Sequence, residues 1–195
     1  QDKATGRLMP ISTRNIDFSQ WDGLWVPCAG SVSPWGTHLG SEEYPPNARA
    51  VEEAKSPDKI NDYYKPMLRY FGIKNPFDKS LRVEEMKAKF NPYRYGYPVE
   101  IFVKGDGSTR VEKRMAMGRL AVELAYVMPD KKTAYISDDG ENVGLFLFIA
   151  DTPGDLGAGR LYAAKWVQKH ADNGGAANLE WIDLGHATQA EIKAA

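Results

Sequence analysis

The spacing of hydrophobic and polar residues divides the chain into three stretches. Residues 1–46 are mostly polar and irregular, and residues 28–46 are dense in Gly, Ser, Thr and Pro, which predicts a loop with short extended pieces. Residues 47–90 carry apolar side chains at helical spacing, whereas from Val99 onward the spacing falls to about two, the period of a strand with one buried face. The sequence therefore predicts a loop, then a helical insertion, then a series of strands.

The helical stretch contains three residues that favour helix starts. Asn47, Asp58 and Ser80 each precede an apolar periodic segment and can accept hydrogen bonds from the first free backbone amides. The expected helices cover residues 48–54, 58–71 and 81–90, with a weak helix at 189–195. The charged positions of the insertion are expected to face solvent.

The last part of the chain alternates short apolar segments with turn-rich links. The predicted strands are Val99–Lys104, Val111–Met115, Leu120–Val127, Thr133–Ser137, Gly144–Ala150, Arg160–Trp166 and Leu179–Leu184. The links contain Gly, Asp, Asn and Pro at positions that tight turns require. Short strands at this spacing are typical of an antiparallel meander, as in a sandwich, a barrel or a propeller. We therefore expect a mainly β fold, with antiparallel strands over residues 91–195 and a further candidate for a short strand at Leu24–Pro27.

Composition narrows the class of protein. The 25 basic and 26 acidic residues nearly cancel, which argues against a broad basic face for nucleic acid. The longest apolar run is far shorter than the roughly 20 residues that a membrane helix needs, so no transmembrane segment is expected. No signal-peptide pattern opens the printed sequence. The single Cys excludes an internal disulfide framework.

Cys28 is the first candidate for chemistry. A free Cys is often a small buried hydrophobe, and that reading stays open. A catalytic thiol needs a His partner, but none of the three His residues stands in a known thiol-protease signature. A zinc site is poorly supported because the CxxC and HxxxH spacings do not occur. If Cys28 has chemistry, its partners are expected to be carboxylates.

Two glutamates lie within predicted strands. Glu123 is the only polar residue on its face of the strand, and a carboxylate among small apolar groups must be paired or bound to a cation. It is therefore interpreted either as the partner of Arg114 or Arg119, or as a metal ligand. Glu100 shares a face with Phe102 and a lysine, so solvent exposure remains an alternative for it.

Further acidic residues lie in loops. Glu42 and Glu43 are adjacent on an expected extended piece, so at most one of them should face a given site. The acidic turn at 138–142 lacks the twelve-residue EF-hand pattern and is explained as a hairpin turn without a ligand.

Four ordered segments resemble the PhoX-type alkaline phosphatases. The run Cys28–Glu43 (CAGSVSPWGTHLGSEE) is similar to the family's CAGG/TxTPWGTxLxxEE, and Tyr95–Ile101 (YGYPVEI) to YGWxVEI. Lys113–Glu123 (KRMAMGRLAVE) is similar to KRxxLGRFxHE. Ala134–Asp139 (AYISDD), followed by Gly144–Ala150, is similar to VYxGDD…YKFV. The first segment is the most specific of the four.

The resemblance implies an exported phosphomonoesterase on a β-propeller that depends on Fe³⁺ and Ca²⁺. By motif position, Cys28 would be the thiolate ligand of iron, and Glu100 and Glu123 would be carboxylate ligands. One of the two adjacent glutamates, Glu43 by preference, would support them. Arg119 would be the catalytic arginine. Small phosphate esters would be the substrates, and the periplasm or the exterior would be the location.

The resemblance covers the N-terminal part of the longer family proteins. It implies that the chain is a piece of a longer protein, a partial propeller domain over 1–195 completed by the rest of its own propeller or by a partner chain.

Two departures favour a non-catalytic binding or assembly module instead. Val122 stands where the family commonly has His, and the family's later RPE segment does not occur. A related metallohydrolase acting on other esters is a third alternative.

Overall fold

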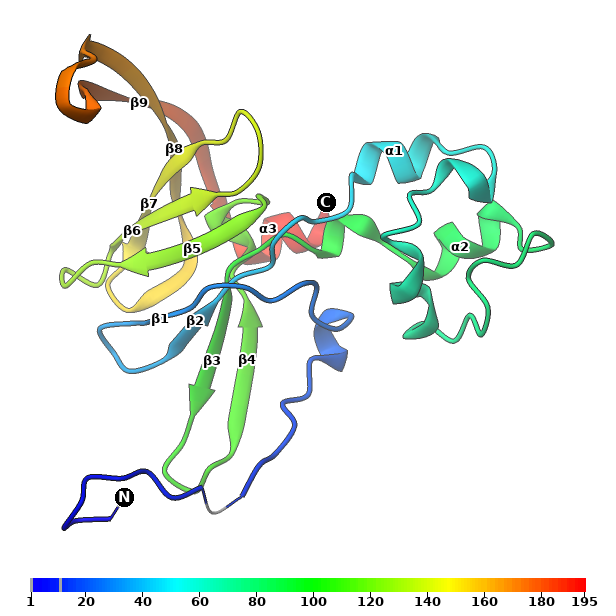
Figure 1. Cartoon of the computed structure of the whole chain (residues 1–195), viewed down its shortest axis with the longest axis horizontal. Coiled ribbons are helices and arrows are strands. Elements are labelled where there is room, and N and C mark those ends of the chain that lie inside the picture. The colour runs from blue at the N-terminus through cyan, green and yellow to red at the C-terminus, as the bar shows by residue number, and fades with distance from the viewer. Residues whose placement is uncertain (1, 11) are drawn as a thin grey trace.

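Two antiparallel sheets dominate the computed structural model, which describes residues 2–10 and 12–195 (Figure 1). The first sheet has the order β1-β2-β3-β4, with β1 at Ser31–Val32, β2 at His38–Gly40, β3 at Val99–Val103 and β4 at Thr109–Lys113. The second has the order β5-β6-β7-β8-β9, with β5 at Val122–Val127, β6 at Thr133–Asp138, β7 at Leu145–Thr152, β8 at Asp155–His170 and β9 at Ala176–Thr188. The expected mainly β, antiparallel fold is confirmed.

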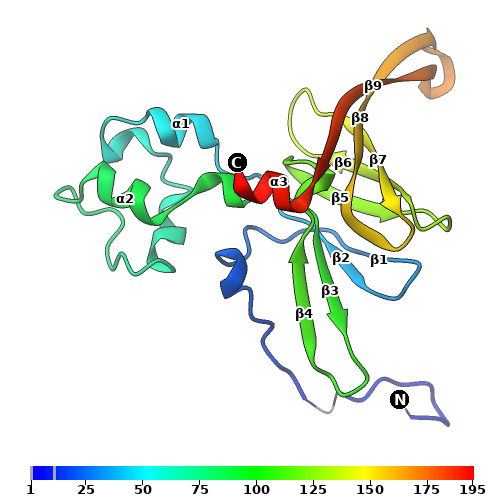
Figure 2. The same ribbon diagram turned by 180° about the vertical axis from the view of Figure 1, so that it is seen from behind.

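The helices are short, and those of residues 48–89 gather on the other side of the molecule from the sheets, whereas the C-terminal helix lies beside the end of β9, as both ribbon views show (Figures 1 and 2). The α-helices are α1 at Ala48–Glu53, α2 at Val83–Lys89 and α3 at Gln189–Ala194. The 3₁₀ helices are Ser19–Trp21, Pro57–Lys59, Lys65–Arg69, Pro92–Arg94, Met115–Met117 and Asp172–Gly174. Among the described residues, no helix has the length and apolarity that a bilayer crossing requires. The division into 1–46, 47–90 and 91–195 as units of one domain stays a prediction.

The first and last predicted helices are confirmed. Asn47 caps α1, because its side chain accepts a hydrogen bond from the amide of Ala50 at 3.0 Å. At the C-terminus, Thr188 and Glu191 form a capping box that starts α3.

The prediction of one helix over 58–71 is wrong. This segment forms the 3₁₀ helices Pro57–Lys59 and Lys65–Arg69 instead. Pro66 has no amide hydrogen to donate within the segment, and the side chain of Asn61 accepts the amide of Tyr63 in a turn. The third helix starts after Arg82 rather than at Ser80, because the hydroxyl of Ser80 donates to Asp78 and does not cap.

The strands β8 and β9 are longer than predicted. The expected link over 151–159 is a tight turn around Gly154, and β8 begins at Asp155. Gly159 lies within this strand, paired with Ala150 and Ala187, and a side chain is excluded there because a Cβ would meet the ring of Phe148 at 2.5 Å. Glycine therefore marks a close approach of a ring here rather than a loop. Past the start of β7 at Leu145, β8 and β9 continue together as a two-stranded arm with a tip at residues 171–175 (Figure 1).

A β-bulge corrects the predicted face pattern of β5. Val122 pairs with Asp138 and Leu124 pairs with Ser137, so Glu123 is an extra residue without an opposite partner. Strict alternation would place Val122 and Leu124 on one face. The bulge instead leaves Val122 in the same buried cluster as Ala125 and Val127.

Three hydrophobic clusters support these elements. One lies where β2 and the five-stranded sheet meet and includes Leu39, Val122, Ile136 and Phe148. A second holds the helical region together, with Trp25 at its centre against the rings of Tyr63, Tyr64, Phe90 and Tyr95. A third comprises Trp21, Tyr97, Val111 and Met115. The segment that contains Cys28 and Glu43 runs between the first two clusters.

Candidate metal centre

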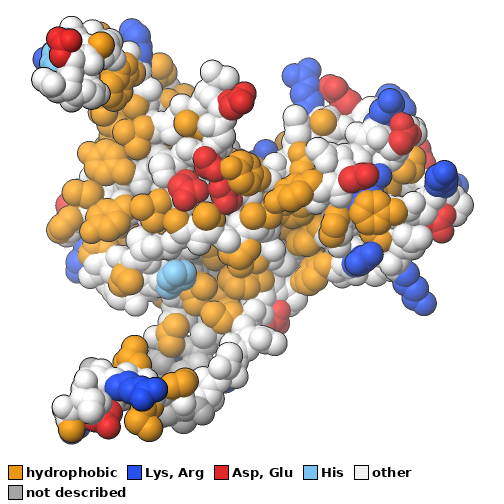
Figure 3. Space-filling view, in the orientation of Figure 1, with side chains coloured by type: hydrophobic (Ala, Val, Ile, Leu, Met, Phe, Trp, Pro, Cys, Tyr) orange, Lys and Arg blue, Asp and Glu red, His pale blue; other side chains and the backbone are white. Residues whose placement is uncertain are grey.

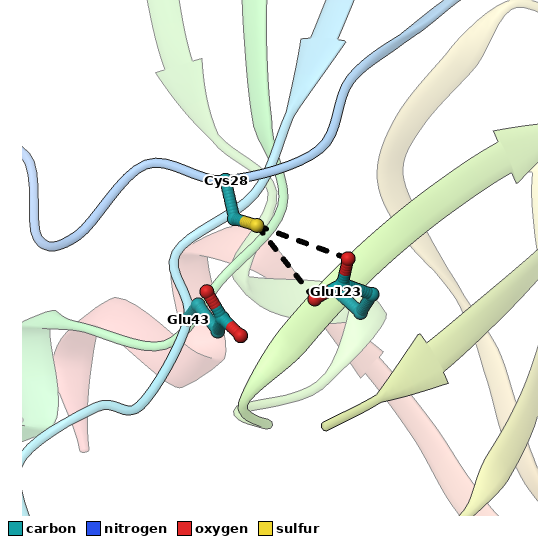
Figure 4. Close-up of side chains that lie close together, drawn as sticks. All are labelled: Cys28, Glu43 and Glu123. Carbon is teal, nitrogen blue, oxygen red and sulfur yellow. Dashed lines mark hydrogen bonds between the residues drawn. The ribbon is translucent and has the colours of Figure 1, made fainter. Parts of the chain in front are cut away.

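Three side chains from three separate segments converge near the start of β5 (Figure 4). Cys28 lies in the loop before β1, Glu43 follows β2, and Glu123 is the bulge residue of β5. Their ligand atoms all lie within 4.8 Å of one another. The sulfur of Cys28 is 3.8 Å and 3.7 Å from the two carboxylate oxygens of Glu123. This is the only such group of potential metal ligands among the described residues.

Backbone hydrogen bonds fix the three segments against one another. The amide of Glu43 donates to the carbonyl of Val26 at 3.1 Å, and the amide of Val122 donates to the carbonyl of Glu42 at 3.1 Å. Pro27 and Glu42 form an isolated antiparallel bridge. The backbone of Glu42 therefore pairs on one side with the segment that contains Cys28 and on the other side with β5. Backbone pairing therefore fixes the positions of the three segments that carry the cluster.

Glu42 and Glu43 point in opposite directions, as expected for adjacent residues of an extended piece. Glu43 faces Cys28, whereas Glu42 is completely buried and forms an ion pair with Lys113 at 2.8 Å. The same carboxylate accepts the amides of Trp25, Gly96 and Tyr97. Four donors around one carboxylate match the ionised form. Of the two glutamates, the structure places Glu43 at the cluster.

Two positions beside the cluster have strained backbones. Val26 and Tyr44 have positive φ angles, 30° and 47°, in a region that branched and bulky residues rarely adopt. Val26 lies two residues before Cys28, and Tyr44 follows Glu43 directly. Such strain persists only where surrounding contacts over-determine the conformation, and it is typical of functional sites.

The cluster is acidic and lacks a cation of its own. No ion pair to Glu43 or Glu123 is formed by the described residues. The pKa of Cys28 is raised, chiefly because its thiol is hydrogen-bonded to Glu43, then by burial and the charge of Glu123. The pKa of Glu43 is raised as well, first by burial and then by Asp139. A bound cation would favour the ionised forms of both side chains and so lower both pKa values.

Asp139 is a neighbour that the sequence interpretation missed. The sequence predicts a hairpin turn without a ligand here, but the amide of Asp139 donates to the carbonyl of Ala121 at 3.0 Å, which brings the turn to the start of β5. The hydroxyl of Tyr44 donates to its carboxylate. This contact lowers the pKa of Asp139 and raises the pKa of Tyr44 to about 12. The signal in the sequence is the fourth motif, in which the segment AYISDD ends on Asp139.

Glu100 lies apart from the cluster, and its carboxylate is fully occupied. It is completely buried and accepts hydrogen bonds from Trp35 at 2.8 Å and Thr37 at 2.6 Å. Arg114 binds its second oxygen with two nitrogens, at 2.6 Å and 2.5 Å. Solvent exposure is therefore excluded for Glu100. The expected glutamate–arginine pair does form, but on Glu100 rather than on Glu123. A ligand role for Glu100 stays a prediction.

Arg119 also has structural partners. One of its guanidinium nitrogens donates to the carbonyls of Pro46 at 2.6 Å and Pro92 at 3.1 Å, which joins the loop after Glu43 to the connector before β3. Burial lowers its pKa from the usual value. The side chain lines a cavity that also contains Tyr44 and Asp139. A catalytic role for Arg119 stays a prediction.

The donor set fits the metals that the sequence resemblance implies. A thiolate suits iron, and hard carboxylate oxygens suit both Fe³⁺ and Ca²⁺. The two types of donor occur together here, in one group of side chains. Cys28, Glu43 and Glu123 are the residues that would hold such a group, with Asp139 beside them.

We expect Cys28 to react slowly with alkylating agents in metal-free protein. Its raised pKa reduces the thiolate fraction at pH 8, and the thiolate is the reactive form. Glu43→Gln should lower that pKa and speed alkylation by iodoacetamide about threefold, because tenfold in thiolate follows each unit of pKa. Glu53→Gln, an exposed helix position, is the matched control. Equal rates in all three proteins would contradict this electrostatic picture.

Comparisons with known proteins agree with the resemblance in the sequence. A family model described as "Alkaline phosphatase PhoX" matches residues 5–195. No curated protein and no solved structure matches the chain.

Proposed function

Because the chain belongs to the PhoX alkaline phosphatase family, we propose that its full-length protein hydrolyses phosphate monoesters at a centre that includes Cys28, Glu43 and Glu123. In this reaction water forms a new bond to phosphorus. The bond from phosphorus to the ester oxygen breaks, and a proton from water ends on the leaving alcohol. The substrates are small phosphate esters.

The observation that carries this proposal is the convergence of a thiol and two carboxylates with which no Lys or Arg of the described residues forms an ion pair. Fe³⁺ and Ca²⁺, when bound, would withdraw charge from the phosphate oxygens and stabilise the charge that develops in the transition state. Cys28, Glu43 and Glu123 would hold these ions. Asp139, hydrogen-bonded by Tyr44, is placed to orient Glu43 or to accept a proton beside it.

Two further residues belong to the proposal by motif position. Glu100 would have to exchange the guanidinium of Arg114 for a metal ion in order to act as a ligand. Arg119 would contact the phosphate from the cavity wall.

We also propose that the two sheets are parts of a β-propeller completed by the rest of the protein or by a partner chain. Export to the periplasm or beyond is part of the same proposal.

A second candidate is a non-catalytic binding or assembly module. The family commonly has a His before the site glutamate, whereas this chain has Val122, which is completely buried in the core. No polar group is available at that position to assist the neighbouring carboxylate.

Metal analysis with an activity assay separates the two candidates. Natively purified full-length protein should contain iron and calcium and should release phosphate from p-nitrophenyl phosphate. Chelation should abolish the activity, and returning the metals should restore it. Protein that contains neither metal and releases no phosphate would exclude the phosphatase and support the binding module.

A further inference from the structure

A cavity of about 590 Å³ adjoins the candidate metal centre on the side of the helical region. Tyr44 and Asp139 belong to its wall and are also in contact with each other beside Glu43. Asn61, Tyr63 and Tyr64 close it from the helical side. The space-filling view shows acidic and hydrophobic side chains side by side where the sheets meet the helical region (Figure 3). A leaving group attached to a phosphate at the centre would extend into this cavity.

The cavity combines aromatic rings with negative charge. Tyr44 and Tyr63 are about half exposed, at 46% and 52%, so part of each ring is accessible to a ligand. Trp25 packs edge-on against Tyr63 and Tyr64 at 5.8 Å and 5.9 Å, which holds these two rings in place. Rigid tyrosine rings attract organic cations through their π faces.

The wall of the cavity has more acidic than basic side chains. Asp138, Asp139 and Glu141 are acidic, whereas Arg119 is the one basic residue among the described residues of the wall. The guanidinium of Arg119 already donates to two backbone carbonyls. The cavity should therefore attract a positive group and repel a leaving group that carries further negative charge.

We propose that this cavity is a subsite for leaving groups that carry an amine or a quaternary ammonium. The proposal rests on the proposed phosphatase function and specifies its preferred substrates as phosphate esters of cationic alcohols. The ammonium lies against the rings of Tyr44 and Tyr63, with Glu141 and Asp138 supplying the attractive charge.

The test compares two esters of the same shape in the metal-loaded full-length protein. Phosphocholine has a trimethylammonium group, and 3,3-dimethylbutyl phosphate has an uncharged tert-butyl group in the same place. We expect kcat/KM to be about five- to tenfold higher for phosphocholine, the range that a partly exposed cation–π contact with nearby charge provides. Added salt should reduce this ratio. A ratio within twofold of one would overturn the proposal.

Two variants locate the effect in the cavity. Glu141→Gln and Tyr63→Leu should each lower the ratio of kcat/KM for phosphocholine to kcat/KM for the uncharged ester about threefold. Glu180→Gln on β9, where Glu180 pairs with Lys165, is the matched control and should leave the ratio unchanged. Thermal melting checks that Tyr63→Leu stays folded. An unchanged ratio in both cavity variants would assign the preference elsewhere and overturn the subsite.

Binding of the alcohols alone separates failure of the subsite from failure of the phosphatase. If neither ester is hydrolysed, the proposed function fails, and saturation-transfer NMR with choline and 3,3-dimethylbutanol still tests the cavity. Stronger transfer to choline, lost in Glu141→Gln, would support the subsite. Equal transfer to both alcohols would overturn it.

Discussion

Cys28→Ala is expected to reduce phosphatase activity of the full-length protein by about a hundredfold or more, together with its iron content. Loss of an outer-shell partner of a metal ligand already costs about 10–100-fold, and Cys28 would be a ligand itself. It is the only soft donor in the cluster, and Glu43 and Glu123 alone form a site better suited to calcium. The measurements are metal content and phosphate release on the same sample.

The control for this prediction separates a ligand role from a packing role. Ser80→Ala, a side chain of the helical region remote from the cluster, should change neither quantity. Co²⁺ offers a second readout, because a thiolate ligand gives it an intense near-ultraviolet absorption that Cys28→Ala should abolish. Activity unaffected by Cys28→Ala would sink the iron-ligand role.

Lys113→Met should destabilise the protein by about 3–5 kcal/mol, the usual effect of leaving one member of a buried ion pair without its partner. Lys113 and Glu42 are both completely buried, and the ammonium also donates to the carbonyl of Arg94 at 2.9 Å. Burial lowers the pKa of Lys113 and raises the pKa of Glu42, so neither charge is tolerated alone. Urea unfolding of the wild type and the variant measures the difference.

Two further variants show whether the effect comes from the uncompensated charge. Glu42→Gln combined with Lys113→Met should recover much of the lost stability, because no buried charge remains. Lys165→Met removes the same type of side chain from the exposed pair with Glu180 and should cost less than about 1 kcal/mol. A single Lys113→Met variant as stable as Lys165→Met would contradict the importance of the buried pair.

The sequence pattern predicted those features of the fold that depend on interactions between residues close together in the chain. The antiparallel strands, the Asn47 cap and the helix at 189–194 depend on side-chain alternation and on hydrogen bonds within a few residues. Cys28 and Glu123 were identified because each is unusual in its own segment. The rule that adjacent residues of an extended piece point to opposite sides limited the site to one of Glu42 and Glu43, and the contacts of the folded chain select Glu43.

The remaining features depend on contacts between distant segments. A strict period of two cannot indicate the bulge at Glu123, which arises from the pairing of β5 with β6. The choice of Arg114 for Glu100 is set by the pairing of β3 with β4 and the chain that follows it. Asp139 joins the cluster only because its turn returns to Ala121. None of these contacts has a signature in the spacing of the residues.

The β8–β9 arm has a consequence for hydrogen exchange. Near Ile149, β8 has neighbours on both sides, so its amides should be protected by the whole sheet. Towards Trp166 and Leu179 only the two strands of the arm remain, and both side chains are exposed. A two-stranded hairpin is marginally stable in water, so its amides should exchange through local opening. Protection should fall steadily from the base of the arm to its tip.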